Sequence, residues 1–163
     1  MSESPDRPAA GWLDLLRQAP GMGAGRRRDE VLAPMAEHRE WMADRLEQGK
    51  LGLERYSRVL VDAVLLDPIV QVDRLRGQVD TLIGRLRGAD AGGRFAAGED
   101  GLVVLERLAE MEAALGESVA VAADAMEALG EQPDDAGARL AGIATKLSAL
   151  ADAWDEREDL LRP

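Results

Sequence analysis

The sequence predicts an all-α protein, an antiparallel helical bundle of about four long helices preceded by a short amphipathic helix. Its 163 residues are enough for one domain, and 46% of them are apolar. Aromatic residues make up only 3% of the chain, and apolar residues recur at steps of three and four, which is typical of helices that share a core. Because these apolar stripes are narrow, an elongated coiled-coil-like dimer is the alternative arrangement.

Residues 1–28 are predicted to be a flexible tail that contains a short helix over residues 9–19. The glycine-rich residues 20–25 follow this helix as a hinge. A helix of about three turns is unstable alone, so it must dock on the bundle, on a protein partner or on a lipid surface. The lipid surface is less favoured, because membrane-surface helices usually carry more Lys and Arg. The candidate partner-binding residues are Trp12, Leu13, Leu16, Arg26, Arg27 and Arg28.

Residues 29–88 are predicted to form the first helical pair or one long kinked helix. Pro34 is expected in the first turn, and a bend is expected near Gly49 and Gly52. Asp67 and Pro68 form a good N-cap and first helical residue, so they mark either a kink or a chain reversal. The two expected stripes are Met35, Met42, Leu46, Leu53, Tyr56, Leu60 and Ala63, then Ile69, Val72, Leu75, Val79, Leu82 and Leu86.

Residues 89–99 are predicted to be a linker, and residues 100–163 an acidic helical hairpin. Gly130 is expected to end the first helix of this hairpin, and Asp134 or Asp135 to cap the second. The expected stripes are Leu105, Leu108, Met111, Leu115, Val119, Ala122, Met126 and Leu129, then Leu140, Ile143, Leu147, Leu150, Trp154 and Leu161, with Arg157 as one polar position.

The net charge of -11 comes from the C-terminal part of the chain. Residues 1–98 hold 15 acidic and 15 basic side chains, whereas residues 99–163 hold 16 acidic and 5 basic ones, a difference of -11. Such a charge repels a phosphate backbone, so we expect no nucleic-acid partner. The acidic helices are either solvated faces or a surface for a basic protein partner.

No set of residues predicts a catalytic, cofactor or metal site. The chain has no Cys and one His, His38. Carboxylate di-iron bundles need Glu-x-x-His units, and Met35 stands where that Glu would be. Glu106, Glu110 and Glu117 are expected to be a solvated acidic face. The run Gly21–Arg26 lacks the Gly-Lys-Ser/Thr ending and the preceding strand that phosphate-binding loops require.

One short motif suggests an alternative with catalysis. Asp67-Pro68-Ile69-Val70-Gln71 places an acid and an amide one helical turn apart. This spacing resembles the Asp-x-x-x-Gln of the chemotaxis phosphatase CheZ family, elongated helical hairpins. The resemblance implies that Asp67 and Gln71 would orient a water against a phospho-aspartate. The competing interpretation is that Asp67 is simply a helix N-cap.

We therefore expect a non-catalytic helical protein–protein interaction or assembly module that forms homo-oligomers. The alternative is a response-regulator phosphatase or signalling regulator that uses Asp67 and Gln71. The N-terminus lacks the basic flank and apolar core of a signal peptide, so a cytoplasmic, bacterial-like protein is expected. No apolar run approaches the length of about 18 residues that would span a bilayer.

Overall fold

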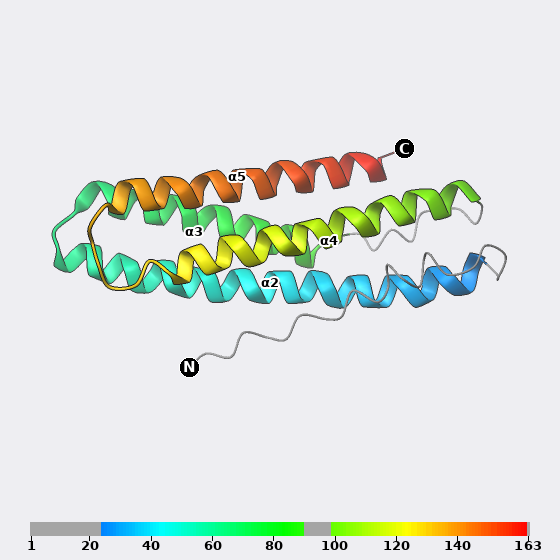
Figure 1. Ribbon diagram of the computed structural model, residues 1–163, viewed down its shortest axis with the longest axis horizontal. Helices are drawn as coiled ribbons and strands as arrows, with labels where there is room; N and C mark the ends of the chain where they lie inside the picture. Colours follow the sequence, from blue (N-terminus) through cyan, green and yellow to red (C-terminus); the bar gives the residue numbers. More distant parts are fainter. Residues whose placement is uncertain (1–23, 90–98, 163) are drawn as a thin grey trace.

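A computed structural model describes the backbone of residues 24–89 and 99–162, and the side chains from residues 32 and 103 onward in these two ranges. The described residues form four helices and no strand: α2 (Ala24–Asp62), α3 (Leu66–Arg87), α4 (Glu99–Glu127) and α5 (Ala136–Leu161). The four helices make one elongated bundle (Figure 1), which confirms the all-α fold class. The predicted N-terminal helix and nearly all of the predicted linker lie outside the described residues.

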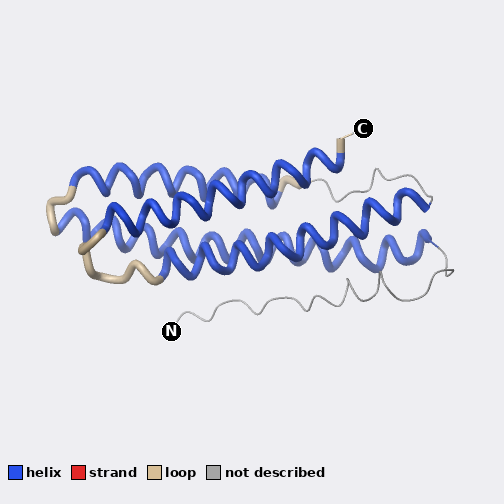
Figure 2. The backbone as a smooth tube through the Cα atoms, turned by 45° about the horizontal axis from the view of Figure 1, so that its top comes forward, coloured by secondary structure: helices blue, strands red, loops and turns tan. Residues whose placement is uncertain are grey.

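The bundle consists of two antiparallel hairpins, α2–α3 and α4–α5, that pack with α2 parallel to α4 and α3 parallel to α5 (Figures 1 and 2). Helices α3 and α4 both contact α2, and α5 completes the square by contacting the same two helices. Ion pairs between α2 and α4 follow the parallel register, since Arg39 meets Glu112 and Arg45 meets Glu127. The linker therefore connects two diagonally opposed helices.

The chain reverses direction between α2 and α3, which decides between the kink and the reversal predicted near Asp67. The turn lies just before that residue, at Ala63–Leu65. Leu65 occupies the N-cap position of α3 and has no side-chain cap hydrogen bond. The prediction that Asp67 caps the helix is therefore wrong. Asp67 and Pro68 lie in the first turn, where an acid complements the helix dipole and a missing N–H costs nothing.

Helix α2 is longer than predicted at its N-terminal end. It begins at Ala24, so the backbone of Arg26–Arg28 belongs to the helix rather than to the tail. Pro34 consequently lies inside the helix and not in its first turn, which corrects that prediction. A proline there removes one backbone donor from the helix, because it has no N–H.

Gly49 and Gly52 lie where α2 and α4 pack closely, and α2 continues through both without interruption. A Cβ atom on Gly52 would lie 2.7 Å from the backbone oxygen of Met126, and one on Gly49 would lie 2.6 Å from the Cε atom of the same residue. At Gly52 the neighbouring atoms are backbone, so only a hydrogen atom fits there, whereas at Gly49 the nearest atom is the end of a flexible side chain. Gly52 therefore permits the close approach of the parallel helices.

The ends of α3 and α4 and the start of α5 lie where the sequence predicts them. Gly88 follows the last residue of α3, and α4 ends just before a turn in which Gly130 has a φ of 63°. Asp135 occupies the N-cap of α5, with a φ of 54° and no side-chain cap hydrogen bond. Arg139 supports the turn by donating to the carbonyl oxygens of Ala128, Leu129 and Gln132.

The core consists of two apolar clusters separated by a charged layer. The larger cluster fills the four-helix part of the bundle. The smaller one lies toward the N-terminal ends of α2 and α4 and contains Met35, Leu105, Leu108 and Ala109. Helix α3 ends before it reaches the smaller cluster, whereas α2 and α4 extend beyond the end of α3 (Figure 1). The layer between the clusters contains His38, Arg39, Glu112 and Arg157, all buried.

Within the described ranges, no helix has both the length and the apolar character needed to cross a membrane.

Candidate functional site

The charged layer is built around Glu112, whose side chain is fully buried. Arg39 on α2 donates from Nη1 to both carboxylate oxygens, at 2.8 and 3.1 Å. Arg157 on α5 donates from Nε to Oε1 of the same carboxylate, at 2.7 Å. Both arginine side chains are at most 5% exposed. Two guanidinium groups from different helices therefore share one carboxylate from a third helix.

Aromatic rings and a histidine enclose this layer. His38 lies 3.1 Å from the backbone oxygen of Glu112 and stacks on Trp41, with ring centroids 5.5 Å apart. The guanidinium of Arg157 lies 4.5 Å from the ring centroid of Trp154. The indole of Trp154 in turn donates to Glu158. Burial and these contacts fix each charged group in place.

This arrangement is suited to structural specificity. The carboxylate of Glu112 is closed to solvent and already accepts hydrogen bonds from two guanidiniums, so it is poorly placed to contact a substrate. Each charge also loses its hydration on burial, which makes the three groups sensitive to the removal of any one. The layer consequently fixes the register of three helices.

Glu112 is absent from the predicted stripe of α4, which passes through Met111 instead. A strict alternation of three and four residues through α4 gives Leu105, Leu108, Glu112, Leu115, Val119, Ala122, Met126 and Leu129, and all eight are buried. The same alternation places His38 and Arg157 on their helices' seams. The polar residues His38, Glu112 and Arg157 thus interrupt the apolar stripes of three helices, and this pattern in the sequence could have predicted the layer.

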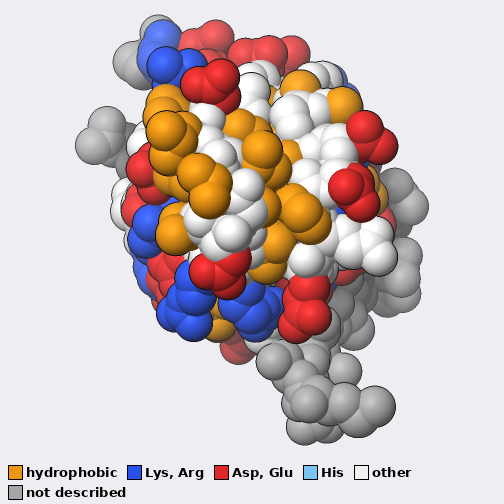
Figure 3. Space-filling view, turned by 90° about the vertical axis from the view of Figure 1, so that its left-hand side faces the viewer, with side chains coloured by type: hydrophobic (Ala, Val, Ile, Leu, Met, Phe, Trp, Pro, Cys, Tyr) orange, Lys and Arg blue, Asp and Glu red, His pale blue; other side chains and the backbone are white. Residues whose placement is uncertain are grey.

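A second feature is an exposed apolar surface at the turn between α2 and α3, here called the apolar tip. Val64 and Leu66 are 76% and 71% exposed, and Val61 and Val70 are exposed by more than half. Figure 3 shows apolar side chains gathered across this end of the bundle. Val64 also has a φ of 57°, a conformation that β-branched residues rarely adopt. The turn thus holds an apolar side chain outward in a strained conformation.

Acidic residues outnumber basic ones around the apolar tip. Asp62 and Asp67 flank it on α2 and α3, and the connection between α4 and α5 lies at the same end of the bundle (Figure 1). That connection supplies three exposed acids, Glu131, Asp134 and Asp135. Arg139 also lies there, but its guanidinium is engaged by backbone carbonyls. Exposed Arg58 and Arg74 lie one turn from Asp62 and Val70 on the same two helices. The tip is therefore apolar at its centre, with side chains of both charges around it and an excess of acids (Figure 3).

Asp67 and Gln71, the predicted catalytic alternative, lie beside the apolar tip. Asp67 is exposed and Gln71 is half-buried, one turn further along α3. The Oε1 atom of Gln71 is shielded from solvent and accepts no hydrogen bond from any described residue. An amide that positions a water at an exposed acid would instead present its polar atoms to solvent beside that acid. The geometry gives this pair no specific support.

Two shallow grooves follow the helix pairs. One between α3 and α5 has a volume of about 460 Å³ and is lined in part by Arg74, Gln78 and Arg85. Burial lowers the pKa of Arg85, but hydrogen bonds to Asp155 and Glu158 outweigh this and keep the pKa above its ordinary value. That guanidinium is therefore already occupied.

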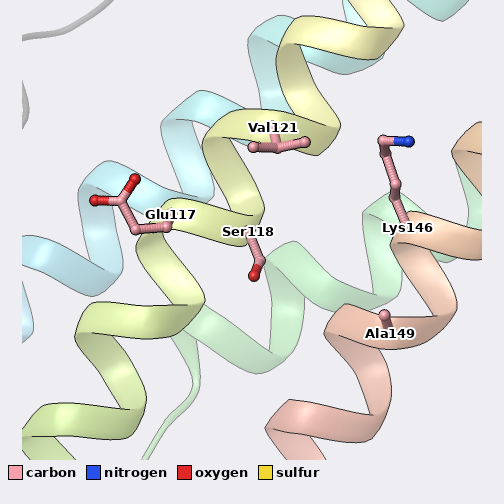
Figure 4. Close-up of a pocket in the computed structure, with 5 residues that line it drawn as sticks. All are labelled: Glu117, Ser118, Val121, Lys146 and Ala149. Atoms are coloured by element: carbon pink, nitrogen blue, oxygen red, sulfur yellow. The ribbon is translucent and has the colours of Figure 1, made fainter.

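The other groove lies between α4 and α5 and has a volume of about 240 Å³. Ser118 and Val121 line it from α4, and Lys146 and Ala149 from α5, while Glu117 points away from α5 (Figure 4). Glu106, Glu110 and Glu117 are all exposed. Among the residues that the structure describes, no group of three or more His, Asp or Glu side chains could hold a metal ion.

None of the six predicted partner-binding residues is among the described side chains of the apolar tip or of the grooves. Trp12, Leu13 and Leu16 lie outside the described residues, and only the backbone of Arg26, Arg27 and Arg28 is described, in the first turns of α2. These turns lie at the end of the bundle opposite the apolar tip (Figure 1).

Comparison with known proteins gives no match: no family model, no curated protein and no solved structure matches the chain.

Proposed function

We propose that the chain is a non-catalytic helical interaction module that assembles with copies of itself as a scaffold, and that it binds through the apolar tip. The observation that carries this proposal is the gathering of Val61, Val64, Leu66 and Val70 on one end of the bundle. Scattered single apolar residues are normal on protein surfaces, but a contiguous patch with a polar surround is typical of a protein-binding site.

The rest of the molecule supports a binding role over a catalytic one. The buried charged groups Arg39, Glu112 and Arg157 already bind one another. Their layer gives the bundle a fixed register and a rigid frame for its ends. A rigid frame reduces the entropy lost when a surface binds a partner.

The position of the tip also supports a binding role. The turn at Ala63–Leu65 joins two long helices, and Val64 at its centre is 76% exposed, so this side chain gains little from the core. Replacing Val64 with a polar residue that tolerates a positive φ would remove both strain and exposed apolar surface. An exposed valine in this conformation is expected where its side chain contacts a partner.

Sedimentation velocity over a wide range of protein concentration tests the proposal. We expect the wild-type chain to form larger species as its concentration rises. The double variant Val64→Gln/Leu66→Gln should weaken this association about tenfold or more, as removal of central apolar contacts does in other interfaces.

The matched control is Val121→Gln. Val121 is 54% exposed and lies on α4, away from the tip, so its replacement should leave self-association unchanged. If the tip variant associates as the wild type does, or if the wild type stays monomeric throughout, the proposed function is wrong.

A further inference from the structure

We infer that self-association is head to tail: the N-terminal segment of one copy, residues 9–28, docks on the apolar tip of another copy. This inference rests on the proposed function and names the partner of the same surface. The segment brings Trp12, Leu13 and Leu16 as apolar anchors, and its charge is opposite to that of the tip. Chain length and geometry exclude docking within one copy.

The segment and the tip have complementary chemistry. Residues 9–28 contain Arg17, Arg26, Arg27 and Arg28 and one acid, Asp14, which gives a net charge of +3 (4 - 1). The tip carries apolar side chains within a group of carboxylates from Asp62, Asp67, Glu131, Asp134 and Asp135. Opposite charges around an apolar contact favour this pairing and speed its formation.

The distance along α2 prevents the segment from reaching the tip of its own bundle. Helix α2 has 39 residues, so Ala24 lies about 57 Å from Asp62 at 1.5 Å per residue. Even fully extended, the 12 steps from Ala24 back to Trp12 span at most about 43 Å, and Leu16 reaches only about 29 Å. A helix over residues 9–19 would shorten this reach further. Contact between Leu16 and Leu66 therefore needs a second copy.

The acidic surround argues against the simplest alternative, a symmetric dimer with two tips face to face. That arrangement would bring together two surfaces that each carry an excess of carboxylates, and like charges disfavour it. A head-to-tail contact joins two different surfaces. It leaves one free tip and one free N-terminal segment at the ends of every dimer, so copies can continue to add in a chain or close in a ring.

Mixing two full-length variants tests the head-to-tail contact. Val64→Gln/Leu66→Gln disables the tip and keeps the segment, whereas Leu13→Gln/Leu16→Gln disables the segment and keeps the tip. We expect each variant alone to lose association about tenfold or more relative to the wild type. An equimolar mixture should form dimers and nothing larger, because each mixed dimer has one working contact and no further working surface. The Val121→Gln variant should associate like the wild type and add to neither effect.

Other outcomes overturn the inference and distinguish it from the proposed function. If the segment variant associates as well as the wild type while the tip variant does not, the tip binds another surface, so the inference fails and the proposed function stands. The same conclusion follows if both variants are monomeric and their mixture stays monomeric. If the tip variant associates normally, both are wrong.

Binding of the wild type, but not of the segment variant, to vesicles of anionic phospholipid at the same concentration would assign the segment to a lipid surface and overturn the inference.

Discussion

Glu112 and Arg157 are joined by a 2.7 Å hydrogen bond between two side chains that are 0% and 1% exposed, on helices whose chain directions oppose each other. Arg39 reaches the same carboxylate from α2. The three helices are thereby held at one relative height. A shift of any helix by one turn would bury a charge against apolar side chains.

Glu112→Gln should lower the free energy of unfolding by about 3–5 kcal/mol, because two buried guanidiniums lose their shared counter-charge. Urea unfolding followed by circular dichroism measures this. The matched control is Glu110→Gln, two residues away and exposed, which should change stability by about 0.5 kcal/mol or less.

The triple variant Arg39→Met/Glu112→Leu/Arg157→Leu distinguishes the effect of unpaired buried charge from the effect of altered packing. Replacing a complete buried ion cluster with apolar residues is often neutral or stabilising, so most of the stability lost in Glu112→Gln should return. If the triple variant is as unstable as Glu112→Gln, the loss comes from altered packing and not from unpaired charge.

Gly52→Ala should destabilise the protein by about 1–3 kcal/mol, although alanine is the better helix former. The new methyl group would press on the backbone of Met126 and Glu127, which cannot move aside as a flexible side chain can. Gly77→Ala provides the control, because nothing lies within 4 Å of a Cβ atom there. It should raise stability by about 0.5–1 kcal/mol. Equal effects of the two variants would contradict a close approach of α2 and α4.

Much of the fold could be predicted because the apolar residues follow a strict period. The helix ends at Gly88 and near Gly130 were predicted from residues that act locally. The parallel pairing of α2 with α4 was not, since each stripe is compatible with either orientation of the two hairpins. Glu112 was not recognised for a related reason. In the sequence it is a single acid beside Met111, and only the packing of the helices shows that two arginines lie next to it.

Val64→Asn should raise the free energy of unfolding by about 1 kcal/mol, because asparagine tolerates the positive φ that strains valine. Thermal unfolding compared with Val61→Asn tests this. Val61 is similarly exposed but lies within α2, so its replacement should give no gain. A gain of the same size in both variants would mean that loss of exposed apolar surface, and not relief of strain, is the cause.

Arg139→Gln should lower stability by about 1–3 kcal/mol, because the guanidinium donates to three carbonyl oxygens in the connection that follows α4. It also lies 5.6 Å from the ring centroid of Tyr56. Arg107→Gln is the control, since Arg107 is exposed and its ion pair to Glu110 spans 3.8 Å. A smaller loss at Arg139 than at Arg107 would contradict a capping role.

The pKa of Lys50 should lie above its ordinary value, chiefly because its ammonium donates a hydrogen bond to Asp80, 2.7 Å away. The negative charges of Asp80 and Glu54 raise this pKa further, whereas burial and the positive charge of Arg76 lower it. A raised folded pKa stabilises the protein at pH values below the unfolded pKa of about 10.4, and the contribution is lost as the pH rises through the folded pKa. NMR titration of the Lys50 Cε signal measures the shift. Asp80→Asn should lower the folded pKa toward its unperturbed value, whereas Asp73→Asn should leave it unchanged.

The parallel contact between α2 and α4 also has a consequence for how the chain folds. Its ion pairs join residues 73 and 82 positions apart, as in Arg39–Glu112 and Arg45–Glu127, whereas each hairpin closes through a short turn. Loop-closure entropy favours the short connections, so the two hairpins should form early and dock late. Native-state hydrogen exchange should then reveal partial opening in which the hairpins separate while each keeps its own backbone amides protected.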